Sequence, residues 1–102
     1  MDREEVLATL RAHEAELRAA GVERLSLFGS VARGDQTDRS DVDVAIRLRP
    51  EAANGSFAYF GRLDALVRRI GDILGCPVDV VTEPIRTERL KRAVEKESML
   101  AF

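Results

Sequence analysis

The sequence has almost no cysteine, no tryptophan and no long apolar run. Cys76 is the single cysteine, which excludes an internal disulfide and a zinc site built from cysteines. No apolar stretch approaches the ~20 residues that span a bilayer. The charged start at residues 2–5 also lacks the pattern of a secretory signal. We therefore expect a cytoplasmic protein without a membrane segment.

A strong excess of positive charge is also missing. Sixteen Lys and Arg residues face 18 Asp and Glu residues, for a formal net charge of −2. Nucleic-acid-binding domains usually carry a clustered basic surface, whereas the arginines here are spread along the chain. Nucleic acid is therefore an unlikely partner. The length predicts one domain, residues 1–102, with a single core and no room for a second, substrate-binding domain.

Residues 25–34 have the composition of a phosphate-binding turn. The apolar run Leu25–Phe28 ends at Gly29-Ser30. Glycine permits a close backbone approach, and a small hydroxyl can donate to an anion. We expect a strand over residues 24–28 and then a short helix over residues 30–33 whose amide groups face phosphates. The alternative is that Gly29-Ser30 is an ordinary turn.

A pair of carboxylates follows shortly after. Asp41 and Asp43 open a run over residues 42–48 in which apolar residues alternate with polar or small ones, the period of a strand. Side chains at i and i+2 share one face, so both carboxylates point the same way. Neighbouring carboxylates repel unless a cation lies between them, and Mg²⁺ binds such oxygens together with substrate phosphates. A solvated strand face is the alternative, but the nearby turn favours magnesium-nucleotide chemistry.

A third carboxylate, Asp79, lies in the otherwise β-branched run Val78–Thr82. Asp43 and Asp79 both lie near the starts of their strands, so they share a site if these strands are parallel. The helix expected between them suits a crossover connection. Gly29 lies at the end of its strand, which should therefore run antiparallel to residues 42–48. All polar groups then converge at one end of the sheet.

These residues resemble a known family. G-S-V-A-R-G at residues 29–34, followed by S-D-V-D-V at residues 40–44, is similar to the G-S-x-A-R-G…S-D-x-D signature of the minimal nucleotidyltransferases. That family belongs to the DNA polymerase β-like superfamily and often supplies the antitoxin beside a HEPN-type toxin. The resemblance implies an α+β nucleotidyltransferase fold with a small mixed three-stranded sheet and about four helices.

The resemblance also implies a reaction and a set of site residues. The expected reaction transfers AMP from ATP, with two Mg²⁺ ions, to a hydroxyl of a HEPN-type partner, most simply a tyrosine. Three carboxylates would bind metal and act in catalysis: Asp41, Asp43 and Asp79. Four residues would bind the nucleotide: Gly29, Ser30, Arg33 and Ser40. For Arg33 a second interpretation stays open, an ion pair with Asp35, Asp38 or Asp41.

The remaining chain predicts helices that cover the sheet. A first helix over residues 2–20 presents one apolar stripe, formed by Val6, Leu7, Leu10 and Leu17. His13 lies beside this stripe and is expected to be packed or half-exposed. A second helix over residues 57–74 ends at Gly75, and a third begins at Pro84 or Ile85 and runs to about Glu97. The apolar residues 99–102 either enter the core or form an interface.

Two further functions compete with a protein-modifying enzyme. One is an antitoxin that masks its toxin by binding, with weak or lost chemistry. The other is a small-molecule nucleotidyltransferase, which would need a partner subunit to bind the acceptor. The three carboxylates favour the enzyme, because a protein that acts only by binding does not require them.

Overall fold

The computed structural model describes residues 2–34, 41–50 and 57–102, apart from the side chains of residues 57–60. Along the chain its elements are α1 (Arg3–Ala12), α2 (Glu14–Ala19), β1 (Val22–Phe28), α3 (Gly29–Arg33), β2 (Val42–Leu48), α4 (Phe57–Leu74), β3 (Val78–Thr82), α5 (Glu88–Glu97) and β4 (Met99–Leu100). Within these residues no helix is both long and apolar enough to cross a membrane.

The strands form one mixed sheet in the order β3-β2-β1-β4. β2 runs parallel to β3, and β1 runs antiparallel to β2, which confirms the directions expected from the placement of the polar residues. The described sheet has four strands where three were expected. The fourth, β4, pairs antiparallel with β1 over two residues. A strand of two residues is too short to show a sequence period. It forms because the backbone groups at the edge of β1 can pair with it.

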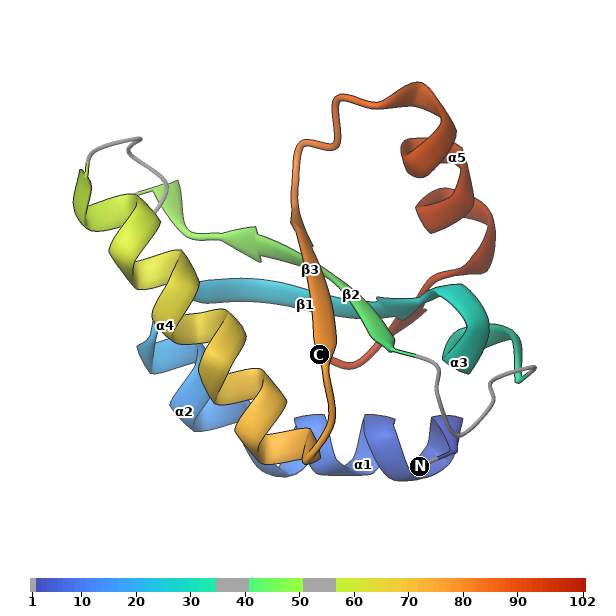
Figure 1. Ribbon diagram of the computed structural model, residues 1–102, viewed down its shortest axis with the longest axis horizontal. Helices are drawn as coiled ribbons and strands as arrows, with labels where there is room; N and C mark the ends of the chain where they lie inside the picture. The colour runs from blue at the N-terminus through green and yellow to red at the C-terminus, as the bar shows by residue number, and fades with distance from the viewer. Residues whose placement is uncertain (1, 35–40, 51–56) are drawn as a thin grey trace.

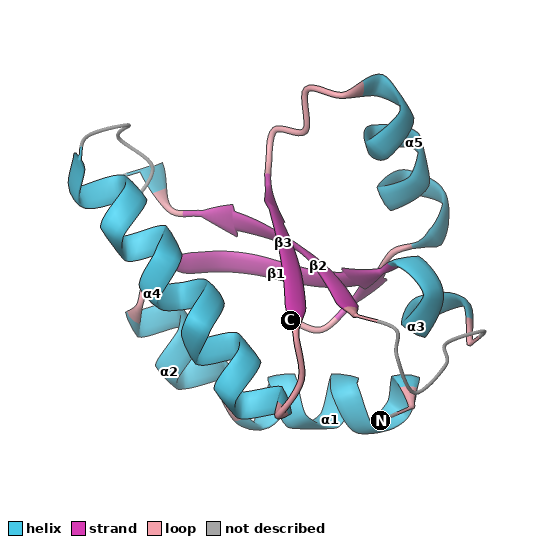
Figure 2. Ribbon diagram, in the orientation of Figure 1, coloured by secondary structure: helices cyan, strands magenta, loops and turns pink. Residues whose placement is uncertain are grey.

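The two faces of the sheet are covered by different helices. Helices α1, α2 and α4 lie on one side, and α5 lies on the other, as Figure 1 shows; Figure 2 shows the strands between these layers. The alternation along β2 explains the division. Val44 and Ile46 are fully buried in the main core under α1 and α4, whereas Ala45 points the other way and packs against Val94 of α5.

The main core joins the three helices of the first layer to the sheet. Leu10 of α1, Leu17 of α2 and Ile70 of α4 are fully buried in it. Arg69 of α4 also donates through Nη2 to Glu16 Oε1 of α2 at 2.9 Å. This bond lowers the pKa of Glu16. The apolar stripe predicted for residues 2–20 is buried in this core as expected: Val6, Leu7, Leu10 and Leu17.

The first helix is interrupted, where one helix over residues 2–20 was expected. His13 has φ −105° and ψ 15°, and it separates α1 from α2. Its ring Nδ1 lies 2.9 Å from the carbonyl oxygen of Thr9, and its side chain is half-buried, as expected. No apolar residue stands at positions 13 or 14. The chain can therefore bend there without exposing Leu10 or Leu17.

The C-terminal helix also begins later than expected. It starts at Glu88 rather than at Pro84 or Ile85, because Ile85 packs into the small cluster beneath α5 while still outside the helix. Gly75 ends α4 with φ +70°, as expected.

The apolar residues 99–102 enter the fold rather than standing free of it. The Ala101 amide donates to the Leu25 carbonyl at 2.9 Å. Ala101 is buried, and Leu100 is half-exposed. Arg11 of α1 covers this edge, because its Nε donates to the Ala101 carbonyl at 2.8 Å and its Nη2 to the Leu100 carbonyl at 3.1 Å.

Candidate active site

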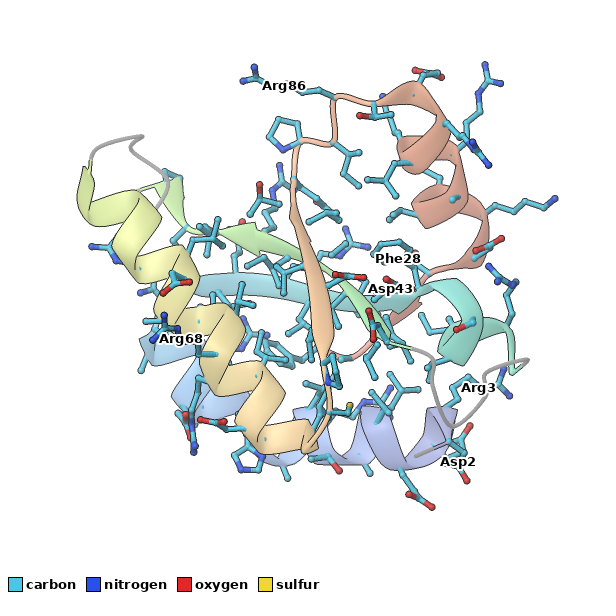
Figure 3. All side chains as sticks on the ribbon, viewed as in Figure 1. Asp2, Arg3, Phe28, Asp43, Arg68 and Arg86 are labelled. Atoms are coloured by element: carbon cyan, nitrogen blue, oxygen red, sulfur yellow. The ribbon has the colours of Figure 1, made fainter. Side chains whose placement is uncertain are left out.

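Two carboxylates of neighbouring strands lie side by side on the α5 face. Asp43 of β2 and Asp79 of β3 are register partners in the parallel ladder. Asp43 lies two residues before Ala45 on β2, and Ala45 packs toward α5. The side chains of Asp43 and of its register partner Asp79 therefore lie on that same face. Asp79 is exposed and Asp43 is half-buried. Figure 3 shows Asp43 next to Phe28, its register partner on β1, between α3 and α5.

Gly29 brings the start of α3 against the Asp43 carboxylate. It has φ +78°, a conformation that side chains rarely adopt. A Cβ atom at this position would lie 2.2 Å from Asp43 Oδ2. Glycine is therefore required here for two reasons, the backbone angle and the close approach. The turn that the sequence predicts to hold phosphate lies directly beside the predicted metal ligand.

The electrostatics of Asp43 reflect this crowding. Burial raises the pKa of Asp43 above its ordinary value of 3.8, and the negative charges of Asp79 and Asp41 raise it further. The positive charge of Arg33 acts in the opposite direction. Neighbouring negative charges disfavour the ionised form of Asp43 unless a cation lies between the carboxylates. The site is therefore short of positive charge.

Asp41 is exposed and immediately precedes β2. Its charge acts on Asp43, but the three carboxylates do not form a ready-made cage. Among the described residues, no group of three His, Cys, Asp or Glu side chains is placed to hold a metal ion. Because Mg²⁺ usually takes one or two carboxylates and completes its shell with water and substrate phosphates, such a cage is not required.

Arg33 closes the short helix α3 and forms an ion pair with α5. Its Nη1 donates to Glu97 Oε2 at 2.9 Å. Sequence reasoning had considered Asp35, Asp38 and Asp41 as partners, and it missed Glu97. Asp35 and Asp38 lie outside the described residues. The position of Glu97 on the inward-facing stripe of α5 indicates that it meets another element, but it does not identify Arg33 as the partner.

The structure describes one of the two serines that the sequence predicts to bind the nucleotide. Ser30 is half-buried in the first turn of α3, next to Gly29. Ser40 lies outside the described residues. The other end of α3 is held by Arg3, whose Nη1 donates to the Ala32 carbonyl at 3.1 Å. The loop that would contact phosphate is therefore fixed to α1 and, through Arg33, to α5.

The sequence matches a family model described as a nucleotidyltransferase domain, over residues 10–101. It is 43% identical over 95 residues to protein adenylyltransferase MntA of Thermococcus cleftensis, a match that covers 92% of this chain and 90% of that one. It is 32% identical over 95 residues to MJ1379 of Methanocaldococcus jannaschii, named as a candidate protein adenylyltransferase, with 91% of each chain covered.

The structure is similar to three solved structures. One, described as a candidate minimal nucleotidyltransferase, has a TM-score of 0.75 and 29% identity, and the match covers 97% of this chain and 95% of that one. A toxin-antitoxin structure with AMP-PNP has a TM-score of 0.68 and 21% identity, covering 90% and 72%. An MNT antitoxin in complex with tri-AMPylated HEPN toxin of Shewanella oneidensis has a TM-score of 0.63 and 16% identity, covering 94% and 71%. The last two share the fold.

Proposed function

This chain belongs to the nucleotidyltransferase domain family, and from that premise we propose that it transfers AMP from ATP to a hydroxyl of a HEPN-type partner protein. The acceptor is most simply a tyrosine, and the chain acts as the antitoxin of a toxin-antitoxin pair. Two relatives named as adenylyltransferases support this proposal, as does a complex of the same fold with an AMPylated toxin. The observation that carries it is the Asp43 carboxylate, set between Gly29 and Asp79.

The proposed step is an in-line displacement at phosphorus. The acceptor oxygen attacks the α-phosphorus of ATP and forms a new P–O bond. The bond from that phosphorus to the oxygen bridging to the β-phosphate breaks, and pyrophosphate leaves. The hydroxyl proton passes to water beside Asp79, whose negative charge favours its departure. Gly29 and Ser30 hold the β- and γ-phosphates, Ser40 contributes to nucleotide binding, and Arg33 contacts phosphate from the end of α3.

Mg²⁺ fits this set of side chains. Carboxylate oxygens are the ligands that Mg²⁺ prefers. Burial and like charges raise the pKa of Asp43, so a cation bound beside this carboxylate would favour its ionised form. Asp41, Asp43 and Asp79 are the side chains that would hold it, with two ions in the loaded complex. When bound, the metal compensates the charge of the triphosphate and of the leaving pyrophosphate. We place the reaction in the cytoplasm, where ATP is available and the free Cys76 thiol stays reduced.

A second candidate function is an antitoxin that masks its partner without modifying it. It is favoured by one comparison, the fold that the chain shares with proteins solved in toxin-antitoxin complexes. The enzyme remains the better supported function, because three carboxylates at one end of a sheet cost stability and a protein that acts only by binding has no use for them.

The experiment that tests the proposal measures the mass of the partner. The purified chain is incubated with ATP, Mg²⁺ and the product of the neighbouring gene, and intact masses are recorded. We expect the partner to gain one or more AMP units. Asp43→Asn should reduce the initial rate at least about a hundredfold, because a ligand of the metal that compensates the phosphate charge is lost. Asp72→Asn, an exposed carboxylate on α4, is the matched control and should transfer normally.

A partner that stays unmodified yet bound and inhibited would select the masking function instead. Calorimetry provides an independent check of the site. ATP should bind in Mg²⁺ and lose most of its affinity in EDTA, because the bare triphosphate would meet several uncompensated carboxylates. Equal affinity in both buffers would contradict the assignment of the carboxylates.

A further inference from the structure

Arg3 is the first residue of α1, and its side chain reaches the short helix α3. Its Nη1 donates to the Ala32 carbonyl at 3.1 Å, although the two residues lie 29 positions apart in the sequence. Figure 3 shows Arg3 between the start of α1 and α3. The contact therefore ties the first helix of the chain to the element that opens with Gly29 and Ser30.

Helix α3 needs contacts from outside, because it has only five residues. The last carbonyl groups of a helix have no partner within that helix. The amide of Gly34 donates to the carbonyls of Ser30 and Val31. The Ala32 carbonyl accepts from Arg3, and a cation at this end also faces the partial negative charge of the helix terminus. Arg3 therefore completes the C-terminal cap of α3.

The start of α1, from which the Arg3 side chain extends, is itself held firmly. The Asp2 side chain caps this helix, because its Oδ1 accepts from the Glu5 amide at 2.9 Å. Val6, one turn further along, is fully buried in the main core, which also contains Ala32. A side chain that extends from so well fixed a helix end can hold α3 at a constant position.

The Arg3 guanidinium adopts this position at a cost. Its Nε is buried and makes no hydrogen bond with the residues that the structure describes, and Glu4 Oε1 lies 3.6 Å away from it. Burying an N–H group of a cation without a hydrogen bond is unfavourable. An arginine without a specific contact would turn this group toward water. The bond from Nη1 to the Ala32 carbonyl offsets the cost.

The turn at the other end of α3 tolerates little movement. A Cβ atom at Gly29 would lie 2.2 Å from Asp43 Oδ2, so the backbone of the turn and the carboxylate are in close contact. A displacement of about 1 Å can change a reaction rate about a hundredfold, even where its cause lies far from the reacting atoms. A small shift of α3 would therefore alter the geometry between Gly29 and the Asp43 carboxylate.

We propose that Arg3 is a positioning residue, which holds α3 through the Ala32 carbonyl and so keeps the Gly29-Ser30 turn against Asp43. The inference rests on the proposed function, because that function assigns the phosphates of ATP to this turn. Arg3 acts through α3 and is assigned no contact with the nucleotide or the metal.

The test compares two arginines of α1. Arg3→Gln removes the bond to α3, and Arg11→Gln, the matched control, removes the bonds from the same helix to the carbonyls of residues 100 and 101. MgATP affinity is measured by calorimetry at high ionic strength, where the direct effect of the lost charge is screened. We expect Arg3→Gln to weaken MgATP binding about five- to tenfold, the magnitude of one lost hydrogen bond. Arg11→Gln should bind MgATP as the wild type does.

Hydrogen exchange separates the positioning of α3 from general stabilisation. In Arg3→Gln the amides of residues 29–34 should exchange faster than in the wild type, because α3 opens more often. In Arg11→Gln these amides should exchange at the wild-type rate. Arg3→Lys keeps a cationic donor and should restore part of both the MgATP affinity and the protection of these amides.

Equal losses of MgATP affinity in Arg3→Gln and Arg11→Gln would overturn the inference, because both changes would then act through overall stability. Unchanged MgATP affinity in Arg3→Gln would overturn it as well and would leave the proposed function intact. If the wild type bound no MgATP, the proposed function would fail, and hydrogen exchange would decide on Arg3. Faster exchange of residues 29–34 confined to Arg3→Gln would support its hold on α3, and unchanged exchange would refute it.

Discussion

The two faces of the sheet differ in how heavily they are packed. Beneath α1, α2 and α4 the buried side chains form a continuous core that extends from Val6 to Ala101 along the chain. Beneath α5 the cluster of buried residues is smaller and, among the residues that the structure describes, consists of Phe28, Ala45 and Val94. The carboxylates lie on this second, thinly covered face. The molecule therefore separates the surface that supplies stability from the surface that has to remain open to substrate and water.

One strand illustrates how the separation is achieved. Along β2, Val44 and Ile46 enter the main core, while Asp43 between Val42 and Val44 faces the site. Because successive side chains point to opposite faces, the same seven residues can anchor the fold and present the chemistry. The comparison predicts that substitutions on the core face change stability most, and that substitutions on the site face change binding more than folding.

The largest effect on stability is expected from the core face. Ile46→Ala removes a fully buried side chain beneath α1 and α4. It should lower the free energy of unfolding by about 2 to 5 kcal/mol, since it leaves a cavity in a packed core. Urea denaturation followed by circular dichroism measures this. A loss well below 1 kcal/mol would show that the main core does not carry the stability assigned to it.

A smaller effect on stability, combined with a large one on binding, is expected at the turn into α3. Gly29→Ala introduces a Cβ that overlaps the Asp43 carboxylate, in a backbone conformation with φ +78°. We expect a stability loss of about 2 kcal/mol and a loss of MgATP affinity of at least about tenfold.

Gly34→Ala is the matched control for this change. Gly34 has almost the same backbone angle, φ +80°, but an added Cβ would meet nothing within 4 Å. It should show only the cost of the backbone strain, about 1 kcal/mol. If the two variants bound MgATP equally well, the close approach of Gly29 to Asp43 would have no functional meaning.

The small cluster beneath α5 should contribute less than the main core. Val94→Ala removes two methyl groups from a buried position on that face. We expect a loss of about 1 to 2 kcal/mol in the free energy of unfolding, measured in the same denaturation experiment as Ile46→Ala. A loss equal to that of Ile46→Ala would contradict the contrast between the two faces.

The smallest expected effect on stability is a gain rather than a loss, and it comes from Asp43→Asn. The pKa of Asp43 is raised in the folded state by burial and by its acidic neighbours. The folded protein therefore binds this proton more tightly than the unfolded chain does. The associated stability is present below the unfolded value of 3.8 and is lost as the pH rises through the folded pKa. At neutral pH the wild type carries this cost, whereas Asp43→Asn does not.

We expect the melting temperature of Asp43→Asn, without metal, to equal or slightly exceed that of the wild type at pH 7. The difference should shrink on acidification and vanish below pH 3.8. Differential scanning calorimetry across this range gives the comparison, with Asp72→Asn as the control at an exposed position. A pronounced drop at neutral pH would mean that Asp43 holds the fold together rather than serving the site.

Much of this arrangement could be predicted from the sequence, because it follows from short-range periodicity. The alternation over residues 42–48 defined β2 and its two faces, and the polar ends of the strands required one parallel and one antiparallel pairing. Those requirements placed Asp43, Asp79 and Gly29 at one end of the sheet, where the structure has them. What each residue does there stays a proposal.

The remaining features depend on contacts between distant segments. The pairing of β4 with β1 joins Leu100 to Ser26, which is far away in the sequence, so no local sequence pattern predicts it. The bend at His13 separates α1 from α2, although Leu10 and Leu17 on either side of it are both buried in the main core. The partner of Arg33 could not be chosen among many acids without the packing of α5, because Glu97 is distant in sequence.

The contact of Arg11 with β4 has a consequence for self-association. The outer strand of a sheet is a template to which other chains can add, and proteins often block it with a charged side chain. Here the carbonyls of Leu100 and Ala101 are already hydrogen-bonded to one guanidinium. A strand arriving at this edge would have to displace Arg11 before it could pair, so growth of the sheet by aggregation or strand exchange is opposed on this side.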